Sequence, residues 1–130
     1  MTEKKIVRTS KRETIIDLTD MVREMVHNSG ISEGNVVVYI PHTTAAVAIN
    51  ENADPTVKSD FQNFMSKLIP YDMPFSHMEG NSDAHIKSIL VGSSITIPIF
   101  DGEMVLGTWQ GIYFCEFDGP RNRNVIITIN

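Results

Sequence analysis

The stretch ITIPIFDGEMVLGTWQGIYFCEF, residues 95–117, decides the fold class of this chain. Its first five residues alternate isoleucine with Thr96 and Pro98, which is the period of a half-buried strand. Asp101–Gly102 is a hairpin turn signal. Further strands are predicted over residues 104–106, 108–117 and 124–129. The C-terminal part of the chain is therefore predicted to be a β meander.

Three helices are predicted before this meander. The first has an apolar stripe over residues 18–26, and Gly30 is well placed to end it. The second begins at Asp54–Pro55, a cap followed by a proline whose missing N–H costs nothing, and it ends at Pro70. A short third helix is predicted from about residue 82 to residue 91.

Strands also precede the meander. Residues 5–16 are predicted to form two strands, residues 36–40 a buried strand, and residues 46–50 the next one. The order is β-β-α-β-β-α-α followed by the meander. Because the strands cluster instead of alternating strictly with helices, the predicted fold class is α+β, in a single domain over residues 1–130.

The composition excludes several classes of protein. A chain of 130 residues with 42% hydrophobic residues fits one domain with one core. Its net charge of −5 and pI near 5.2 argue against nucleic acid as the main partner, because neutralising phosphates needs a basic face. No apolar run is long enough to span a bilayer, and the N-terminus does not read as a secretory signal. Cys115 is the only cysteine, which rules out an internal disulfide, and the expected location is the cytoplasm.

Three of the four histidines occupy positions where a site can form. His42 follows a buried strand, His77 lies in the irregular segment 70–80, and His85 lies in the first turn of the third helix, beside an apolar stripe expected to be buried. His27 is interpreted as a helix-end residue whose cation complements the helix dipole. Three imidazoles with an open fourth position suit catalytic zinc, so His42, His77 and His85 are predicted to hold a metal ion.

Two carboxylates are candidates for a chemical role. Asp83 either stabilises the N-terminus of the third helix or orients a metal-binding histidine. Glu116 lies on a strand whose two faces are largely apolar, so it needs either a salt bridge, to Arg121 or Arg123, or a catalytic function. Cys115 points to the opposite face and is interpreted as an inert buried thiol.

Two segments are suited to bind phosphate. Gly80–Asn81 leads into a helix N-terminus, whose free N–H groups can receive an anion. The turn GPRNR, residues 119–123, offers the guanidinium groups of Arg121 and Arg123. A capped helix and a charged hairpin also explain these segments, so neither is specific alone.

Longer motifs give a more specific signal. The segments HTTAAVAINENADP (42–55), EGNSDAHIKSILVGSS (79–94), LGTWQGIYFCEFDGPRNR (106–123) and VIITI (125–129) closely resemble the YjbQ family of small bacterial and archaeal proteins. The resemblance implies an α+β fold of one YjbQ-like domain, a mostly antiparallel sheet with about three helices, and assembly as a homotrimer.

The resemblance also implies a polar cluster at the family's signature positions. They are His42, Asn52, His77, Asn81, Asp83, His85, Trp109, Gln110 and Glu116. The predicted catalytic residues are His42, Asp83, His85 and Glu116. The predicted substrate-binding residues are Thr43, Asn52, Asn81, Trp109, Gln110 and Arg121.

YjbQ proteins are commonly described as secondary thiamine-phosphate synthases, which join a pyrimidine diphosphate to a thiazole phosphate. The resemblance therefore implies a transferase that acts on small phosphorylated metabolites. A diphosphate leaving group normally calls for Mg²⁺, whereas three histidines point to zinc. Two alternatives remain open: a metal-dependent hydrolase or lyase, and a non-catalytic module that binds a metal or a metabolite.

Overall fold

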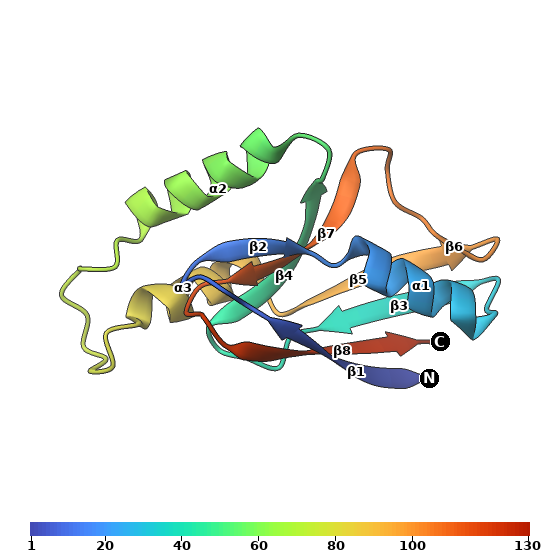
Figure 1. The fold of residues 1–130 in the computed structure, drawn as a ribbon, viewed down its shortest axis with the longest axis horizontal. Coiled ribbons are helices and arrows are strands. Elements are labelled where there is room, and N and C mark those ends of the chain that lie inside the picture. Colours follow the sequence, from blue (N-terminus) through green and yellow to red (C-terminus); the bar gives the residue numbers. More distant parts are fainter.

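The computed structural model describes all 130 residues and contains three helices and eight strands. The eight strands form two antiparallel sheets (Figure 1). In chain order the elements are β1 (Thr2–Arg8), β2 (Thr14–Asp17), α1 (Thr19–Ser29), β3 (Gly34–Tyr39), β4 (Ala45–Glu51), α2 (Pro55–Leu68), α3 (Ser82–Val91), β5 (Ser94–Phe100), β6 (Glu103–Met104), β7 (Gln110–Glu116) and β8 (Asn122–Ile129). The α+β class and the order of helices and strands along the chain are confirmed. The predicted C-terminal β meander is wrong, because only β5 and β6 pair with each other, whereas β7 pairs with β2 and β4 in the smaller sheet and β8 pairs with β1 and β3 in the larger one. None of the helices has the length and apolar character that a membrane crossing requires.

The two sheets share one apolar core. The larger sheet has the order β1-β8-β3-β5-β6, and the smaller has the order β2-β7-β4. Alternate residues of β3, β5 and β8 point inward and pack against β4, β7 and α1. The fully buried members include Val36, Val38, Ile112, Phe114, Val125 and Ile127. This core fixes the ends of β3, β4, β7 and β8, on which the candidate site is built.

Local signals in the sequence explain where the elements begin and end. The side chain of Asp17 accepts a hydrogen bond from the backbone N–H of Thr19 at 2.9 Å, at the start of α1. Asp54 accepts one from Thr56 at 2.9 Å at the start of α2. Asp101 and Gly102 both have positive φ, at 52° and 78°, which gives the tight turn expected between β5 and β6.

Helix α3 buries its polar side and exposes its apolar side. Asp83, Lys87 and Ser88 are buried, whereas Ile89 is 79% exposed and Leu90 is 60% exposed. The prediction that the apolar stripe of this helix is buried is therefore wrong. The physical reason is that Asp83 and Lys87 find ionic partners beneath the helix.

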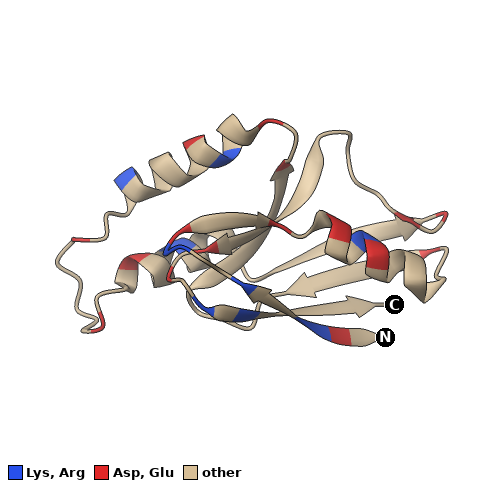
Figure 2. Ribbon diagram, viewed as in Figure 1, with Lys and Arg blue, Asp and Glu red and all other residues tan.

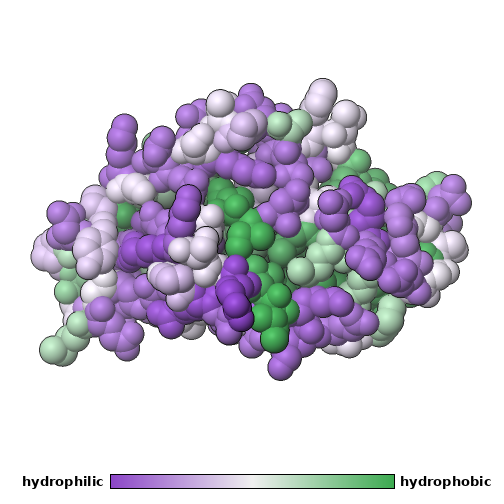
Figure 3. Space-filling model, in the orientation of Figure 1, coloured by the Kyte–Doolittle hydropathy of each residue, from purple (hydrophilic) through white to green (hydrophobic).

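Helix α2 also leaves part of its apolar stripe exposed. Of its fourteen residues only Met65 is buried, and Phe64 and Leu68 are exposed. The helix lies on the outside of the fold in Figure 1, and Phe61 packs against an apolar cluster formed by Ala46, Ala84, Tyr113, Cys115 and Phe117. Figure 3 shows an otherwise largely hydrophilic face of the molecule crossed by an apolar strip. The stripe predicted for this helix is therefore only partly packed: Phe61 and Met65 contact the rest of the chain, whereas Phe64 and Leu68 are exposed.

A buried ion pair joins the two sheets. Arg123 of β8 donates from Nε to both carboxylate oxygens of Glu116 of β7, at 3.0 Å each. Thr9 donates its hydroxyl to Glu116 at 2.7 Å, and Arg123 also donates to the hydroxyl oxygen of Thr44 at 2.8 Å. The predicted salt bridge of Glu116 is confirmed, with Arg123 as its partner.

Arg123→Ala is predicted to destabilise the fold strongly, because it leaves the Glu116 carboxylate buried without a counter-charge. The expected loss in the free energy of unfolding is about 3–5 kcal/mol. Urea denaturation followed by circular dichroism measures it. Arg8→Ala is the matched control, since Arg8 makes only an exposed hydrogen bond to Asn122, and it should cost no more than about 0.5 kcal/mol. Equal losses in the two variants would contradict the prediction.

Candidate functional site

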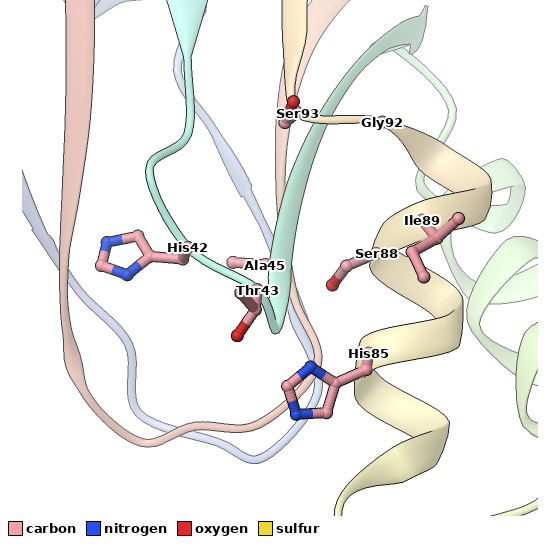
Figure 4. Close-up of a pocket in the computed structure, with 8 residues that line it drawn as sticks. All are labelled: His42, Thr43, Ala45, His85, Ser88, Ile89, Gly92 and Ser93. Carbon is pink, nitrogen blue, oxygen red and sulfur yellow. The ribbon is translucent and has the colours of Figure 1, made fainter.

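A pocket of about 320 Å³ lies between the loop that follows β3 and helix α3. Its walls are formed by His42, Thr43, Ala45, His85, Ser88, Ile89, Gly92 and Ser93 (Figure 4). The side chains of Thr43, Ser88 and His85 point into the space between the loop and the helix, and the His42 ring is turned toward β8. The structure therefore brings two of the three predicted histidines to one pocket.

His42 is held in its neutral form. Its Nε2 accepts a hydrogen bond from the backbone N–H of Asn124 at 2.8 Å, so the ring proton is on Nδ1. Burial lowers the pKa of His42, and the positive charge of Arg123 lowers it further, against the opposing effect of Glu116. A neutral imidazole held in this tautomer can act as a defined hydrogen-bond donor through Nδ1.

The imidazole ring of His85 lies next to that of His77. The rings of His77 and His85 are 5.2 Å apart between centroids and meet edge to face at 85°. His77 Nε2 is also 3.8 Å from a carboxylate oxygen of Glu79. The irregular segment before α3 and the first turn of α3 thus bring two histidines together, as their places in the sequence suggested.

The three histidines do not form a metal site within one chain. No group of three or more His, Cys, Asp or Glu side chains is arranged to hold a metal ion. The Nε2 atom of His42 is already engaged by Asn124, and His77 and His85 alone supply two adjacent imidazoles. One chain therefore does not fit the three-histidine zinc site, and metal binding stays a prediction.

Asp83 supports α3 from inside the protein. It is fully buried and receives two hydrogen bonds from Arg12, at 2.9 and 3.1 Å, and one from Lys87 at 3.0 Å. Burial on its own raises the pKa of Asp83, but the hydrogen bonds from Arg12 and Lys87 outweigh it and hold that pKa below its ordinary value. Lys87 in turn pairs with Glu13. This geometry favours a role in positioning His85, which lies on α3 between Asp83 and Lys87.

The two arginines of the turn after β7 differ in whether a phosphate can reach their guanidinium groups. Arg123 is buried and committed to Glu116, so the expectation that it meets a phosphate is wrong. Arg121 is half-exposed and pairs with Asp118 at 2.8 Å, and Asn81 donates to the same Asp118 oxygen at 2.8 Å. Of these two arginines, Arg121 is the one that has a guanidinium group open to solvent.

The remaining predicted residues lie at the other end of the smaller sheet. Asn52, Trp109 and Gln110 line a separate cavity of about 250 Å³, together with Asp17, Thr19, Asp20, Arg23, Ala53 and Thr108. Asn52 donates to Asp17 at 2.9 Å and accepts from Lys58 at 2.8 Å.

Strand pairing explains this separation. Ala45 pairs with Glu116 near His42, and Glu51 pairs with Gln110 at the opposite end. Six residue steps along a strand place the two groups about 20 Å apart. The single polar cluster implied by the sequence motifs is therefore split into two half-sites, the His42–His85 pocket and the Trp109 cavity.

Some lining residues were missed by reasoning from the sequence. Ser88 lies three residues after His85, so the helical period places both on one face and offered a usable signal. Ser93 and Gly92 join the pocket only because β5 begins beside the loop that carries His42. No short sequence motif indicates that these two residues lie close to His42.

Comparison with known proteins gives consistent matches along the whole chain. The family model described as UPF0047 protein YjbQ-like matches residues 3–130. A UPF0047 protein of Methanocaldococcus jannaschii is 55% identical over 95% of this chain and 89% of its own length. The UPF0047 protein YugU of Bacillus subtilis is 48% identical over 93% of this chain and 92% of its own. A crystal structure of a Clostridium acetobutylicum protein of the YjbQ/UPF0047 family superposes with a TM-score of 0.97, at 49% identity, over 98% of this chain and 99% of that chain.

His42 is predicted to titrate below about pH 6.5, the ordinary value for histidine. Since its pKa is lowered in the folded state, the stability that depends on neutral His42 is present above that pH and falls as the solution becomes more acidic. NMR of the ring nitrogens measures the titration and the tautomer. His42→Gln should lose less stability than the wild type on acidification from about pH 6.5 to about pH 5. A titration midpoint above the ordinary value would refute the prediction.

Proposed function

This chain belongs to the UPF0047 YjbQ-like family, and from that premise we propose that it is an enzyme acting on a small phosphorylated metabolite. The specific reaction proposed is the synthesis of thiamine phosphate from a pyrimidine diphosphate and a thiazole phosphate. The observation that carries the proposal is the pocket in which Thr43, His85 and Ser88 converge beside the neutral His42. Convergent polar groups in a pocket with a histidine of perturbed pKa are typical of an active site.

Each pocket residue has a chemical role in this reaction. The thiazole nitrogen forms a carbon–nitrogen bond while the carbon–oxygen bond to the diphosphate breaks, so negative charge builds up on the leaving diphosphate. The hydroxyl of Thr43 and the imidazole of His85 supply hydrogen bonds to those oxygens, whereas the Ser88 hydroxyl donates to the carbonyl of Ala84 and shapes the wall of the pocket. The Arg121 guanidinium supplies a positive charge for a phosphate at the rim. Asp83 and Glu116 act by holding α3 and the His42 loop in place.

A metal ion is proposed at the His77–His85 pair. Zinc is the expected ion because both ligands are imidazoles, and it would act as a Lewis acid toward phosphate oxygens. Two adjacent imidazoles leave the remaining ligands to come from substrate, water or another chain. This pair also supports the second candidate function, a metal-dependent hydrolase or lyase. Incubating the purified protein with phosphoesters and lactones separates that candidate from the transferase.

Assembly and location belong to the same proposal. The exposed apolar faces of α2 and α3 support assembly, and we propose the homotrimer that the family resemblance implies. The buried Cys115 thiol, whose pKa burial raises to about 12, is inert and is compatible with a cytoplasmic protein.

His85→Ala is predicted to abolish the formation of thiamine phosphate from the two precursors while the protein stays folded, because it removes a donor from the pocket. Product formation is measured by chromatography, and folding by circular dichroism. His27→Ala is the control, since His27 lies on α1 and pairs with the exposed Glu103. If His85→Ala retained wild-type turnover, this result would contradict the proposed transferase function. Absence of turnover in the wild type as well, against every substrate tried, would favour a non-catalytic module.

The metal proposal makes a separate prediction. Untreated purified protein should contain zinc near stoichiometric amounts, and His77→Ala and His85→Ala should each lose most of it, whereas His27→Ala should not. Elemental analysis by mass spectrometry measures the content. A zinc content below about 0.2 ions per chain in the wild type would contradict the metal proposal, and the histidines would then serve in acid–base catalysis alone.

A further inference from the structure

We propose that the Trp109 cavity is a second ligand site, which binds one small, flat heteroaromatic ring that carries an amino group next to a ring nitrogen. The cavity contains the groups that would recognise such a ring: an exposed indole, a free amide donor and a carboxylate. The proposal goes beyond the proposed function, because this cavity shares no residue with the His42–His85 pocket.

Trp109 supplies the surface on which the ring stacks. Its side chain is 64% exposed directly before β7, and no aromatic ring or cation of this chain packs on its face. Stacking on a tryptophan accepts many ring types, because every heteroaromatic ring has a π face. Trp109 therefore supplies affinity for a flat ring, and the polar groups beside it must supply the specificity.

Gln110 is preorganised to donate a hydrogen bond into the cavity. Its Oε1 accepts from the backbone N–H of Gly107 at 2.8 Å, which fixes the amide and leaves Nε2 without a partner in this chain. The contact is close, since a Cβ at Gly107 would lie only 3.3 Å from Gln110 Oε1. The free Nε2 donor suits a ring nitrogen that carries a lone pair.

Asp17 presents a carboxylate of fixed orientation to the same cavity. Its Oδ1 accepts from the backbone N–H of Thr19, and its Oδ2 from Nδ2 of Asn52, both at 2.9 Å. Burial raises the pKa of Asp17, but these hydrogen bonds outweigh it and hold the pKa below its ordinary value. An ionised carboxylate oxygen accepts more than one hydrogen bond, so Oδ2 can also receive an N–H of the amino group on the ring.

Asn52 shows that the wall of the cavity is held by specific contacts. Its two amide atoms are both engaged, because Nδ2 donates to Asp17 and Oδ1 accepts from Lys58 of α2 at 2.8 Å. The side chain lies so close to β7 that a Cβ at Gly111 would overlap it. A glycine is therefore needed at this position for Asn52 to hold the Asp17 carboxylate in place.

Charge and size narrow the class of ligand. Arg23 is the cation on the cavity wall, and it pairs with Asp20 at 2.7 Å. Figure 2 shows acidic and basic residues next to one another along α1, and no charge on the segment that leads from β6 into β7. Because no free cation is available for a phosphate, the expected ligand is a ring without a phosphate group. The cavity volume of about 250 Å³ is below the range of about 300–1,000 Å³ for drug-sized ligands, which suits an aminopyrimidine or an aminopurine.

The single tryptophan of the chain gives a direct test. Its indole N–H is one signal in a proton–nitrogen NMR correlation spectrum, so this signal reports on the Trp109 cavity. Adding 4-aminopyrimidine or adenosine to the purified protein should shift the signal in a saturable way, and the tighter of the two identifies the source of the ring. Aniline has the amino group but no ring nitrogen, and it should bind about tenfold more weakly than the aminopyrimidine.

Gln110→Glu tests the amide donor with little change in shape. The new carboxylate can still accept from the N–H of Gly107, but the Nε2 donor is lost, so the Kd for the aminopyrimidine should rise about tenfold while that for aniline does not. Gln62→Glu is the matched control, since it makes the same change on α2 outside the cavity. Circular dichroism checks that both variants stay folded.

Three results would overturn the proposal: no saturable shift with either the aminopyrimidine or adenosine, equal affinity for aniline and the aminopyrimidine, or equal Kd values in Gln110→Glu and Gln62→Glu. His85→Ala separates this site from the proposed active site, because it should leave the shift of the Trp109 signal unchanged. Loss of the shift in folded His85→Ala would show one site instead of two and would also overturn the proposal. Absence of thiamine phosphate formation in the wild type would contradict the transferase function alone.

Discussion

The ion pair between Arg123 and Glu116 ties the two sheets together at the end of the molecule where the candidate site lies. Arg123 belongs to the larger sheet and Glu116 to the smaller one, and both side chains are removed from water. Hydrogen bonds with Thr9 and Thr44 satisfy the remaining polar atoms, which is the condition under which a buried pair is tolerated. Because Thr44 lies two residues after His42, the same contacts set the path of the loop that carries this histidine.

The pair also determines the state of His42. Asn124, the next residue after Arg123, donates the backbone hydrogen bond to His42 Nε2, and the Arg123 charge disfavours a proton on that ring. A second buried ionic group, in which Asp83 pairs with Arg12 and Lys87, lies beneath α3 and fixes the orientation of this helix. It lets the helix face the sheet with its polar side, so the position of His85 also depends on buried charge.

The sequence was sufficient for the elements but not for their orientation. Caps and turns such as Asp54 and Asp101–Gly102 act over a few residues, and they predicted helix and strand boundaries well. The partner of Glu116 was also foreseen, because a buried carboxylate needs a cation. The faces of α3 were not, because the charges that allow Asp83 to be buried come from Arg12, far away in the chain.

The grouping of residues in the candidate site was also only partly predictable from the sequence. Motif order grouped Asn52 and Gln110 with the histidines, whereas distance depends on strand register, and the pairing of Glu51 with Gln110 puts them at the far end. The partner of His42 is a backbone N–H of Asn124, and a backbone group has no sequence signal. The His77–His85 pair was accessible to sequence reasoning because both residues lie close to the start of one helix.

The exposed pocket bears on which reaction is feasible. Transfer of a pyrimidine group to a thiazole nitrogen competes with attack by water, so a transferase must exclude water while the diphosphate leaves. In a single chain the pocket is bordered by the largely exposed Ile89, an arrangement that leaves water free to react and suits a hydrolase. The choice between transfer and hydrolysis at His42 and His85 therefore depends on whether the pocket is covered when the diphosphate leaves.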